Sequence, residues 1–593
     1  MAEVEIVPKP QWRTILTVTA APGPSPPAGT AILTLDGPHG LTDDDGVWVS
    51  GLSGISGVSE ISEQAITVID PTTVSLDGTS ISGTYGGGGV FRDASQNRHR
   101  INNSNNRPLQ SGGPLYFTVY YIPSTQRTVT VSEAQRISVY KSTDSGATWV
   151  RQDSGTEQSL SGNTDFGVAI DGSTEWHSYK NGSVVVGSRV WDVLRLRPFN
   201  VVSNTWGALS PDGPKMDPPQ PTSFPVVMAD GRLFVYYEHS ELRPGSASLD
   251  EKRPAWAIYD PVGNVWDSVD NYFAKPNNTI IDVVAGSPNS VQTATAHGYQ
   301  TGDTILIAGT SGVTNVNGTR IITVTGPATF TTGSSGTGTY GGGGTTHFAD
   351  DVRANGLAIG DGGRIHLFYG SDNNSSGTSF QPANLYQRTF DTTSLTLAGD
   401  EQLITAEMSA RFAGYGVPLA YTSGATRKLI IPISHQANTG GAGTADKVQV
   451  AEADDALNPV WSITDVSATN KPYGSAQFCW ADVAYDPATD KLWLFWTSPQ
   501  DPDGKTNIVY NTKTAGGAWG ADVTWKTHSE YWYADPAPAI IGGQVTVIYT
   551  KVHPNEIGTG ESIGTELERF PHIDVVSVCP PAAGVNRAFF FGR

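Results

Sequence analysis

The segment FPVVMADGRLFVYYEHS, residues 224–240, reads as a β-hairpin in which an apolar strand, an Asp-Gly turn and a strand rich in Val, Leu and aromatics follow one another. WAIYDPVGNVWD, residues 256–267, then supplies another strand that ends at a turn and a Trp. The same order returns in GLAIGDGGRIHLFYGSD (356–372), PLAYTSGATRKLIIPIS (418–434), ADVAYDPATDKLWLFWTS (481–498) and APAIIGGQVTVIYTK (537–551). The repetition predicts a series of four-stranded antiparallel sheets.

Units of this kind, repeated every roughly 45 to 65 residues, are typical of β-propeller blades. Two further units are LYFTVYYIPSTQRTVTVSE (115–133) and DFGVAIDGSTEWHSYKNGSVVVGSRVWDVLRL (165–196). The sequence therefore predicts an all-β chain with about seven blades, or six if one unit is shared or broken.

KSTDSGATWV, residues 141–150, carries the pattern S-x-D-x-G-x-T-W; its members are Ser142, Asp144, Gly146, Thr148 and Trp149. The pattern resembles the Asp-box of sialidases and related propellers. This resemblance implies that the Asp braces a turn, the Gly takes a positive φ and the Trp packs between neighbouring sheets. We therefore interpret the motif as structural rather than catalytic. Degenerate relatives end other units, at Trp206, Trp266 and Trp519.

Residues 34–91 and 293–348 are two copies of another, smaller module. Matching positions are His39-Gly40 with His297-Gly298, Gly51 with Gly309, Pro71 with Pro327 and Tyr85-Gly86 with Tyr340-Gly341. Each copy predicts four or five short strands in a small β barrel or sandwich. The two histidines are expected to pack on their own modules, although a functional pair is an alternative. Both copies close on GTYGGGG, which lacks the Lys-Ser/Thr of a phosphate loop and is interpreted as a flexible hinge.

AHGYQTGD and VNGTRIITV in the second copy resemble small β domains, similar to the FCCH domain of ubiquitin-activating enzymes, that recur in bacteriophage tail proteins. The first copy departs from the pattern, with TDDDG in place of TGD, and is expected to serve packing. The resemblance implies a virion context more than an activity.

The predicted organisation follows from these repeats. It comprises an N-terminal arm (1–30), a first small module (31–92), the first part of the propeller (93–285), a second module inserted in it (286–348), the remaining blades (349–578) and a C-terminal tail (579–593).

Composition excludes several classes of function. The chain has 593 residues and a formal net charge of −20, and it shows no basic stripe that could neutralise phosphates, so nucleic acid is not an expected partner. No cofactor motif occurs, and no CxxC or HxxxH spacing suggests a metal. Cys479 and Cys579 are expected to be core thiols, with a disulfide as the alternative. We expect neither a secretion signal nor membrane insertion.

A sialidase-type hydrolase is the natural enzyme hypothesis, and it needs converging arginines and a Glu-activated Tyr. Arg92, Arg98 and Arg100 occur without the Arg-Ile-Pro segment of that family. Arg232, Arg364 and Arg427 fall in the hairpins of successive units, where they are expected to be solvated turn residues rather than a substrate clamp.

HSEYWYADP, residues 528–536, is the most suggestive cluster of carboxylates and aromatics. Glu530, Tyr531 and Asp535 are the catalytic candidates, and His528, Trp532 and Tyr533 are the ligand-binding candidates. The alternatives are packing in the core or at an interface, a stacking platform for sugars, and an activated phenol.

The resemblance to phage tail modules thus implies a structural protein of a bacteriophage tail, located in the virion. Its expected partners are other tail or baseplate proteins, in a homo- or hetero-oligomeric assembly, and a host-surface glycan receptor. The three Phe in VNRAFFFGR (585–593) are expected to dock into a partner or into the propeller itself. The alternative is a tail-borne glycan hydrolase, sialidase-like or another depolymerase, and a third hypothesis is an extracellular adhesin or lectin.

Overall fold

The protein is seen in a computed structural model, whose described residues form strands and turns and no helix. No helix among them could cross a membrane. The described residues are 4–5, 13–23, 27–39, 46–58, 64–93, 98–100, 109–110, 114–122, 136–144, 148–153, 158–159, 166–186, 189–216, 223–242, 250–272, 277–348, 352–372, 382–405, 411–437, 447–467, 481–499, 506–526, 532–541, 543–552 and 574–578.

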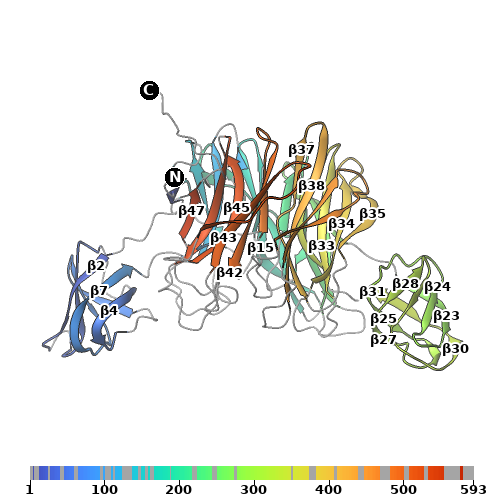
Figure 1. Cartoon of the computed structure of the whole chain (residues 1–593), viewed down its shortest axis with the longest axis horizontal. Coiled ribbons are helices and arrows are strands. Elements are labelled where there is room, and N and C mark those ends of the chain that lie inside the picture. The colour runs from blue at the N-terminus through green and yellow to red at the C-terminus, as the bar shows by residue number, and fades with distance from the viewer. Residues whose placement is uncertain are drawn as a thin grey trace.

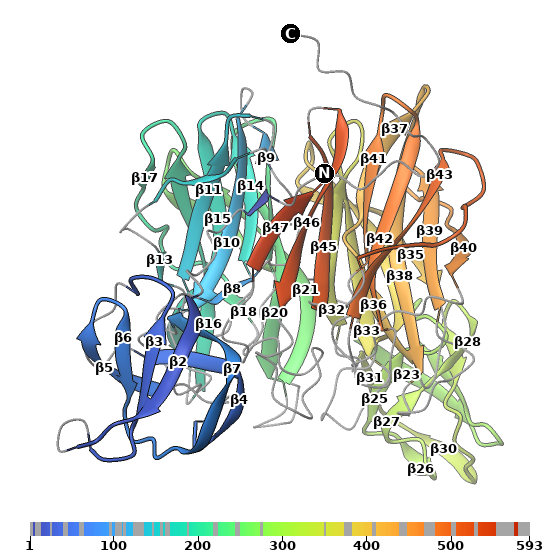
Figure 2. The same ribbon diagram turned by 60° about the vertical axis from the view of Figure 1, so that its left-hand side comes forward.

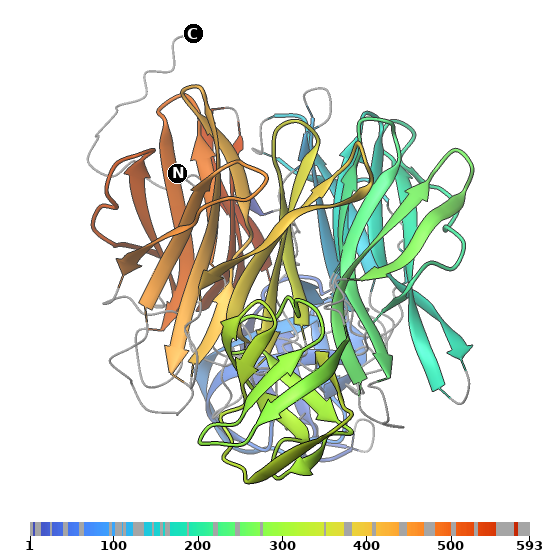
Figure 3. The ribbon, with the colours of Figure 1, turned by 90° about the vertical axis from the view of Figure 1, so that its right-hand side faces the viewer.

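Seven antiparallel sheets form a closed ring, the β-propeller that the repeats predict (Figures 1 and 2). Neighbouring blades contact through their strands all the way round, and the contact between β8 and β47 closes the ring between the last blade and the first. Two small β modules lie at one end of this ring (Figure 3).

The first three blades come directly one after another in the chain. Blade 1 contains β8 (Arg98–Arg100), β9 (Leu109–Gln110), β10 (Leu115–Ile122), β11 (Arg136–Ser142), β12 (Val150–Arg151) and β13 (Gln158–Ser159). Blade 2 contains β14 (Phe166–Asp171), β15 (Thr174–Val186), β16 (Arg189–Asn200), β17 (Thr205–Trp206) and β18 (Lys215–Met216). Blade 3 contains β19 (Ser223–Val227), β20 (Leu233–Leu242), β21 (Asp250–Asp260) and β22 (Val265–Tyr272).

Four blades follow the second module, and the last of them borrows a strand from the N-terminal segment. Blade 4 contains β32 (Val352–Ile359), β33 (Arg364–Asp372), β34 (Pro382–Asp391) and β35 (Thr396–Thr405). Blade 5 contains β36 (Arg411–Tyr415), β37 (Leu419–Ser423), β38 (Thr426–Ala437), β39 (Lys447–Asp454) and β40 (Ser462–Ser467). Blade 6 contains β41 (Ala481–Asp486), β42 (Lys491–Pro499), β43 (Thr506–Thr514) and β44 (Val523–Lys526). Blade 7 contains β45 (Trp532–Ile541), β46 (Gln544–Val552), β47 (Asp574–Val578) and β1 (Val4–Glu5).

Burial on both faces explains why the second strand of a blade reads as a continuous apolar run. In β20, Leu233 and Val235 pack with residues of blade 2. Phe234 and Tyr236, which alternate with them along the strand, pack with residues of blade 4. Side chains alternate across a strand, so a blade held between two neighbours needs apolar residues at both parities. The continuous apolar segment LFVYY is therefore what a strand packed between two neighbouring blades requires.

In several blades, a Trp of the outer hairpin packs against the preceding blade. Trp149 of blade 1 packs with Ile548 of blade 7, and Trp206 of blade 2 packs with Val139 of blade 1. Trp266, Trp461 and Trp519 do the same in blades 3, 5 and 6. Because burial of an aromatic side chain contributes strongly to stability, these Trp residues give their hairpins a role in holding neighbouring blades together.

The first module is a closed six-stranded barrel with its own apolar core. Its strands are β2 (Arg13–Ala20), β3 (Ala31–Leu35), β4 (Gly46–Ser56), β5 (Gln64–Asp70), β6 (Thr73–Leu76) and β7 (Ser82–Asp93). Because β2 belongs to the barrel, the module already includes residues 13–20, and the predicted boundary at residue 31 is too late. β1 is likewise a blade strand and not part of a free arm.

The second module has a seven-stranded sheet and a two-stranded one. Its strands are β23 (Asn278–Val284), β24 (Ser290–Thr293), β25 (Thr304–Ala308), β26 (Ser311–Val313), β27 (Gly318–Ile321), β28 (Thr323–Gly326), β29 (Thr329–Thr331), β30 (Gly338–Gly342) and β31 (Thr345–Phe348). The module begins with β23, so the predicted boundary at residue 286 is also too late.

The glycine runs are ordered strand segments in both modules, which corrects the prediction of a flexible hinge. The Tyr85 hydroxyl donates to the carbonyls of Ile15 and Gly88, and the Tyr340 hydroxyl donates to those of Ile280 and Gly343. Several glycines of both runs have positive φ angles, which bring the backbone carbonyls to the phenol. Residues with a Cβ rarely adopt this conformation.

Both modules occupy the same kind of position in the ring. The second lies between β22, the outer strand of blade 3, and β32, the inner strand of blade 4. The first lies between β1, the outer strand of blade 7, and β8, the inner strand of blade 1. Connections from outer to inner strands lie at one end of a propeller, here called the module end; the tight turns within the blades lie at the other, the hairpin end (Figure 1).

Candidate functional site

The Asp144 carboxylate is the centre of the Asp-box turn at the hairpin end of blade 1. It accepts hydrogen bonds from the Thr148 hydroxyl at 2.6 Å, the Thr148 backbone N–H at 2.8 Å and the Ser142 hydroxyl at 2.8 Å. These donors, the Thr148 hydroxyl foremost, hold the pKa of Asp144 below its usual value. Trp149 is 9% exposed and lies edge-on to Phe117, with ring centroids 6.3 Å apart. Gly146 lies outside the described residues.

The outer hairpins of blades 2, 3 and 4 use a different brace. Asn200 accepts the N–H of Val202 in blade 2, and Asp260 accepts that of Val262 in blade 3. Asp391 accepts the N–H of Thr393 in blade 4. Four residues beyond each brace, Asn204, Asn264 and Leu395 take positive φ. These are Asx turns, so the Trp position is retained in blades 2 and 3 while the Asp-box is not.

The three hairpin arginines do not converge on a common point. Arg232 pairs with Asp230 and Asp267 within blade 3. The other two bridge blades 4 and 5, with Arg364 bound to Asp455 at 3.0 Å and Arg427 bound to the Ile359 carbonyl at 2.7 Å. Each guanidinium is thus held by groups of its own chain. The side chains of Arg92, Arg98 and Arg100 lie outside the described ones.

Two tyrosine–carboxylate pairs lie within blades 4 and 5. Tyr369 donates to Glu401 at 2.5 Å, and Tyr421 donates to Glu452 at 3.2 Å. Burial and the adjacent carboxylate raise the pKa of both phenols. Both phenols are buried within their own blades, so these pairs fit structural hydrogen bonds.

The segment HSEYWYADP leads into β45, the inner strand of blade 7, from the module end. The backbone of Trp532 pairs with that of Val552, and the backbone of Tyr533 pairs with that of Lys551. A register shift separates the pairs formed by Ala534 and Ala537, so Asp535 lies at an irregularity. The side chains of these candidates, and all of His528, Glu530 and Tyr531, lie outside the described part of the chain.

The module histidines pack locally. His297 is buried, accepts the Tyr299 N–H on Nδ1 at 3.0 Å and stacks on the Tyr299 ring at 5.0 Å. His39 Nε2 lies 2.9 Å from the Asp70 carbonyl, and its ring lies 6.5 Å from that of Phe91. Neither arrangement resembles a shared two-histidine site.

Metal-ligating residues do not cluster in the described part of the chain, where no group of three or more His, Cys, Asp or Glu could hold an ion. Cys479, Cys579 and the segment with three Phe fall outside that part.

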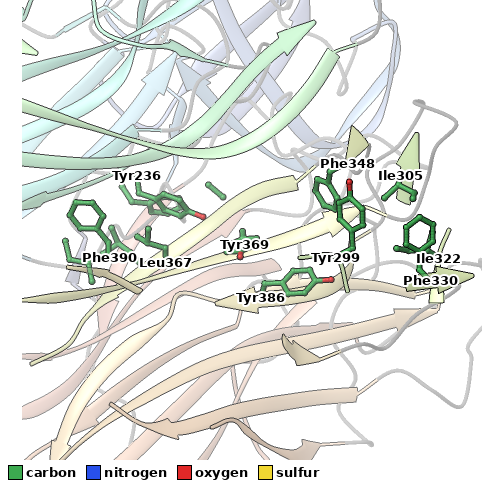
Figure 4. Packing of buried hydrophobic residues seen from close by; sticks show 14 of the residues in the cluster. Tyr236, Tyr299, Ile305, Ile322, Phe330, Phe348, Leu367, Tyr369, Tyr386 and Phe390 are labelled. Atoms are coloured by element: carbon green, nitrogen blue, oxygen red, sulfur yellow. The ribbon is translucent and has the colours of Figure 1, made fainter. Parts of the chain in front are cut away.

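The contact between the second module and the ring was not anticipated from the sequence. Asp303, in the TGD turn, accepts a hydrogen bond from the Tyr386 hydroxyl of blade 4 at 3.1 Å. Arg253 of blade 3 donates to the Phe348 carbonyl at 2.6 Å and lies over its ring. Figure 4 shows Tyr369 and Tyr386 of blade 4 on the side that faces Tyr299 and Phe348 of the module. All four residues belong to one buried cluster. No pattern in the sequence pointed to this contact.

No protein-family model and no curated protein matches the chain. Solved structures that resemble it are β-propellers. The endosialidase of phage phi92 is 13% identical, with 85% of this chain and 72% of that chain covered and a TM-score of 0.31. The α-L-arabinanase of Penicillium chrysogenum is 9% identical, over 81% and 98%, with a TM-score of 0.34. The Hadza microbial sialidase Hz136 is 11% identical, over 93% and 93%, with a TM-score of 0.33.

Proposed function

We propose that this chain is a structural protein of a bacteriophage tail that binds a host-surface glycan at the module end of its propeller. The observation that carries the proposal is the placement of both modules at one end of a rigid ring, each in a connection between an outer and an inner strand. Loops supported by a rigid scaffold are the usual location of binding residues.

The buttressing of the second module supports a binding role. Tyr386 and Arg253 fix its Asp303 and Phe348 through buried contacts, so the module extends the ring as a fixed wall. A surface that is already ordered loses little conformational entropy when it binds a ligand. The hairpin end is left for contacts with other tail or baseplate proteins in the assembly.

The virion location rests on the sequence resemblance of AHGYQTGD and VNGTRIITV to modules of phage tail proteins. The acidic chain, with a formal net charge of −20, is suited to an uncharged or cationic receptor better than to a polyanionic one.

The proposal is tested by measuring binding of the purified protein to envelope polysaccharide from host cells, with release of reducing ends followed in the same samples. We expect saturable binding without product. A variant in which residues 278–348 are replaced by a short Gly-Ser linker should bind more weakly. Absence of binding to any envelope fraction would refute the glycan-receptor role.

Glycan hydrolysis is a second candidate, favoured by one observation: Glu530 and Tyr531 immediately precede the inner strand β45 at the module end. A Glu beside a Tyr at such a position is able to activate the phenol as a nucleophile. Product release that is lost in Glu530→Gln and in Tyr531→Phe, but kept in the neighbouring Ser529→Ala, would establish the hydrolase instead.

A further inference from the structure

A bulge carries Tyr85 on the surface of the first module. The strands β4 and β7 pair at Ser53 with Gly87 and at Ile55 with Gly83, and their register shifts between these two pairs. Three residues of β7, with the tyrosine in the middle, therefore lie opposite a single residue of β4. This unit, here called the tyrosine bulge, comprises residues 53–55 and 83–87.

The second module contains the same unit around Tyr340. The strands β26 and β30 pair at Ser311 with Gly342 and at Val313 with Gly338, with the same shift of register between the pairs. Its tyrosine bulge comprises residues 311–313 and 338–342. The sheets around the two bulges differ, since the first module is a closed six-stranded barrel and the second has a seven-stranded and a two-stranded sheet.

The two bulges agree in geometric detail. The Ser53 hydroxyl donates to the carbonyl of Gly87 at 2.7 Å, and the Ser311 hydroxyl donates to that of Gly342 at 2.9 Å. The φ angle is +103° at the first of these glycines and +102° at the second. Because the unit is the same while the surrounding sheets differ, the requirements of one sheet topology do not explain it.

Each tyrosine ring is partly buried and held in a fixed orientation. The Tyr85 hydroxyl lies 2.7 and 2.5 Å from two backbone carbonyl oxygens, and the Tyr340 hydroxyl lies 2.8 and 2.6 Å from the equivalent two. The residue before each tyrosine is an exposed Thr and the residue after it is an exposed Gly, so the adjoining residues of the strand place little bulk beside the ring. A ring held in this way offers apolar surface next to hydroxyl groups, which matches the C–H faces and hydroxyl edges of a pyranose sugar.

The composition of the bulges points to an uncharged ligand. Residues 52–56 and 82–89 of the first module contain no charged side chain, and neither do residues 310–314 and 338–344 of the second, in a chain with a formal net charge of −20. The exposed hydroxyl oxygens of the two bulge serines are able to accept hydrogen bonds from ligand hydroxyls. These groups fit a neutral saccharide better than a charged one.

We propose that the tyrosine bulge of each module is a contact site for a neutral saccharide, with the ring of Tyr85 or Tyr340 as the stacking surface and Ser53 or Ser311 as a hydrogen-bond partner. The inference rests on the proposed glycan-binding role and names where in the modules the sugar is held. A ring that is already fixed loses little conformational entropy on binding. In the second module, β26 and β30 lie on the side away from the propeller ring, where a long glycan has access (Figures 1 and 2). Two equal sites in one chain suit a polysaccharide of repeating units, because the second contact with the same glycan is intramolecular.

Hydrogen exchange of the full chain, followed by mass spectrometry, tests the sites directly. The probe is a hexasaccharide fraction prepared from the envelope polysaccharide of the host. At saturating probe, we expect slower exchange in peptides that cover residues 82–89 and 338–344. Saturable binding that protects neither segment, or only one of them, would overturn this inference and leave the proposed function standing. Absence of binding would refute both.

Substitution of the tyrosines separates the ring from its hydroxyl. Tyr85→Leu/Tyr340→Leu removes both, and Tyr85→Phe/Tyr340→Phe is the matched control that loses the same hydrogen bonds but keeps the rings. We expect the Leu variant to bind the probe more than about tenfold more weakly than the Phe variant, because each ring contributes to stacking. Exchange at Leu33 and Ile305, in the cores of the two modules, reports whether each variant is folded. Equal affinity of two folded variants would contradict the stacking role, and if the Leu variant does not fold, the exchange of the unmodified chain decides.

Discussion

His366 Nε2 of blade 4 lies 2.8 Å from Asp455 Oδ1 of blade 5, with both side chains fully buried. The amide of Gln387 donates to His366 Nδ1, which leaves the Nε2 proton for Asp455. Arg364 and the backbone N–H of Asp361 also donate to this carboxylate. A single acidic side chain thus joins the hairpin ends of two blades.

Replacing this carboxylate should destabilise the junction. Asp455→Asn is expected to lower the free energy of unfolding by about 1.5–3 kcal/mol, the range for hydrogen bonds to a charged group. Asp454→Asn is the matched control: its exposed pair with Lys428 should contribute below about 1 kcal/mol. Urea unfolding followed by tryptophan fluorescence measures both. Equal losses for the two variants would contradict the bridging role.

The same site predicts an acid dependence. Burial raises the pKa of Asp455, but hydrogen bonds from His366 and Arg364 outweigh it and hold the pKa well below its usual value. A depressed carboxyl pKa stabilises the fold above the unfolded value of about 3.9 and loses that effect as pH falls through the folded value. The stability difference between wild type and Asp455→Asn should therefore shrink from pH 5 toward pH 2. A constant difference would place the effect elsewhere.

Substitutions in the Asp-box should change the stability of the fold and not ligand binding. Asp144→Asn weakens an exposed turn and is expected to cost about 1 kcal/mol, whereas Trp149→Ala removes a buried wedge and is expected to cost about 3–5 kcal/mol. Neither change should alter the proposed glycan binding at the opposite end of the ring. A loss of binding in Asp144→Asn with unchanged stability would contradict this assignment.

The two modules should differ as isolated polypeptides. Residues 13–93 form a closed barrel with a self-contained core, so amide protection of Leu33 should be similar in isolation and in the full chain. Residues 278–348 lose the packing of Phe348 and Tyr299 next to Tyr386, so protection of Ile305 should fall. Hydrogen exchange measures both, and equal behaviour of the modules would contradict the shared cluster.

Glycine substitution tests the close approach of β26 and β30. A Cβ on Gly312, which has φ +86°, would lie 2.0 Å from the Thr339 carbonyl oxygen. Gly312→Ala should therefore cost more than about 3 kcal/mol. Gly424, with φ +60° and no neighbour within 4 Å of its Cβ, should cost only about 1–2 kcal/mol when replaced by Ala. Thermal unfolding of the two variants gives the comparison.

Local patterns in the sequence predicted the propeller and the doubled module because both depend on neighbours along the chain. The segment LFVYY and its relatives gave the blades, and the repeated Tyr-Gly runs gave the modules. The GGGG runs were misread, since their role depends on Tyr85 and Tyr340 hydroxyls curling back on them. Composition alone makes such a run look flexible.

Long-range contacts account for what the sequence did not predict. The place of β1 in blade 7 depends on residues more than five hundred positions away, and two residues carry no recognisable strand pattern. Tyr386 and Asp303 likewise come from units read as separate, so their contact could not be derived from either segment. The hairpin arginines were expected to be solvated turn residues. They do lie at turns, but Arg364 and Arg427 bind groups of the neighbouring blade, which the local pattern of each blade could not predict.

The pairing of β1 with β47 also governs the order in which the protein is able to form. β1 leaves the ribosome more than five hundred residues before its partner β47, so blade 7 cannot be completed until β47 has been made. Blades 1 to 6 can assemble in chain order by contacts between neighbours, while β1 stays unpaired until β47 has been made. Closure over so large a sequence separation is slow, since loop entropy opposes it. The first module, folded early as an independent barrel, keeps the waiting strand next to blade 1.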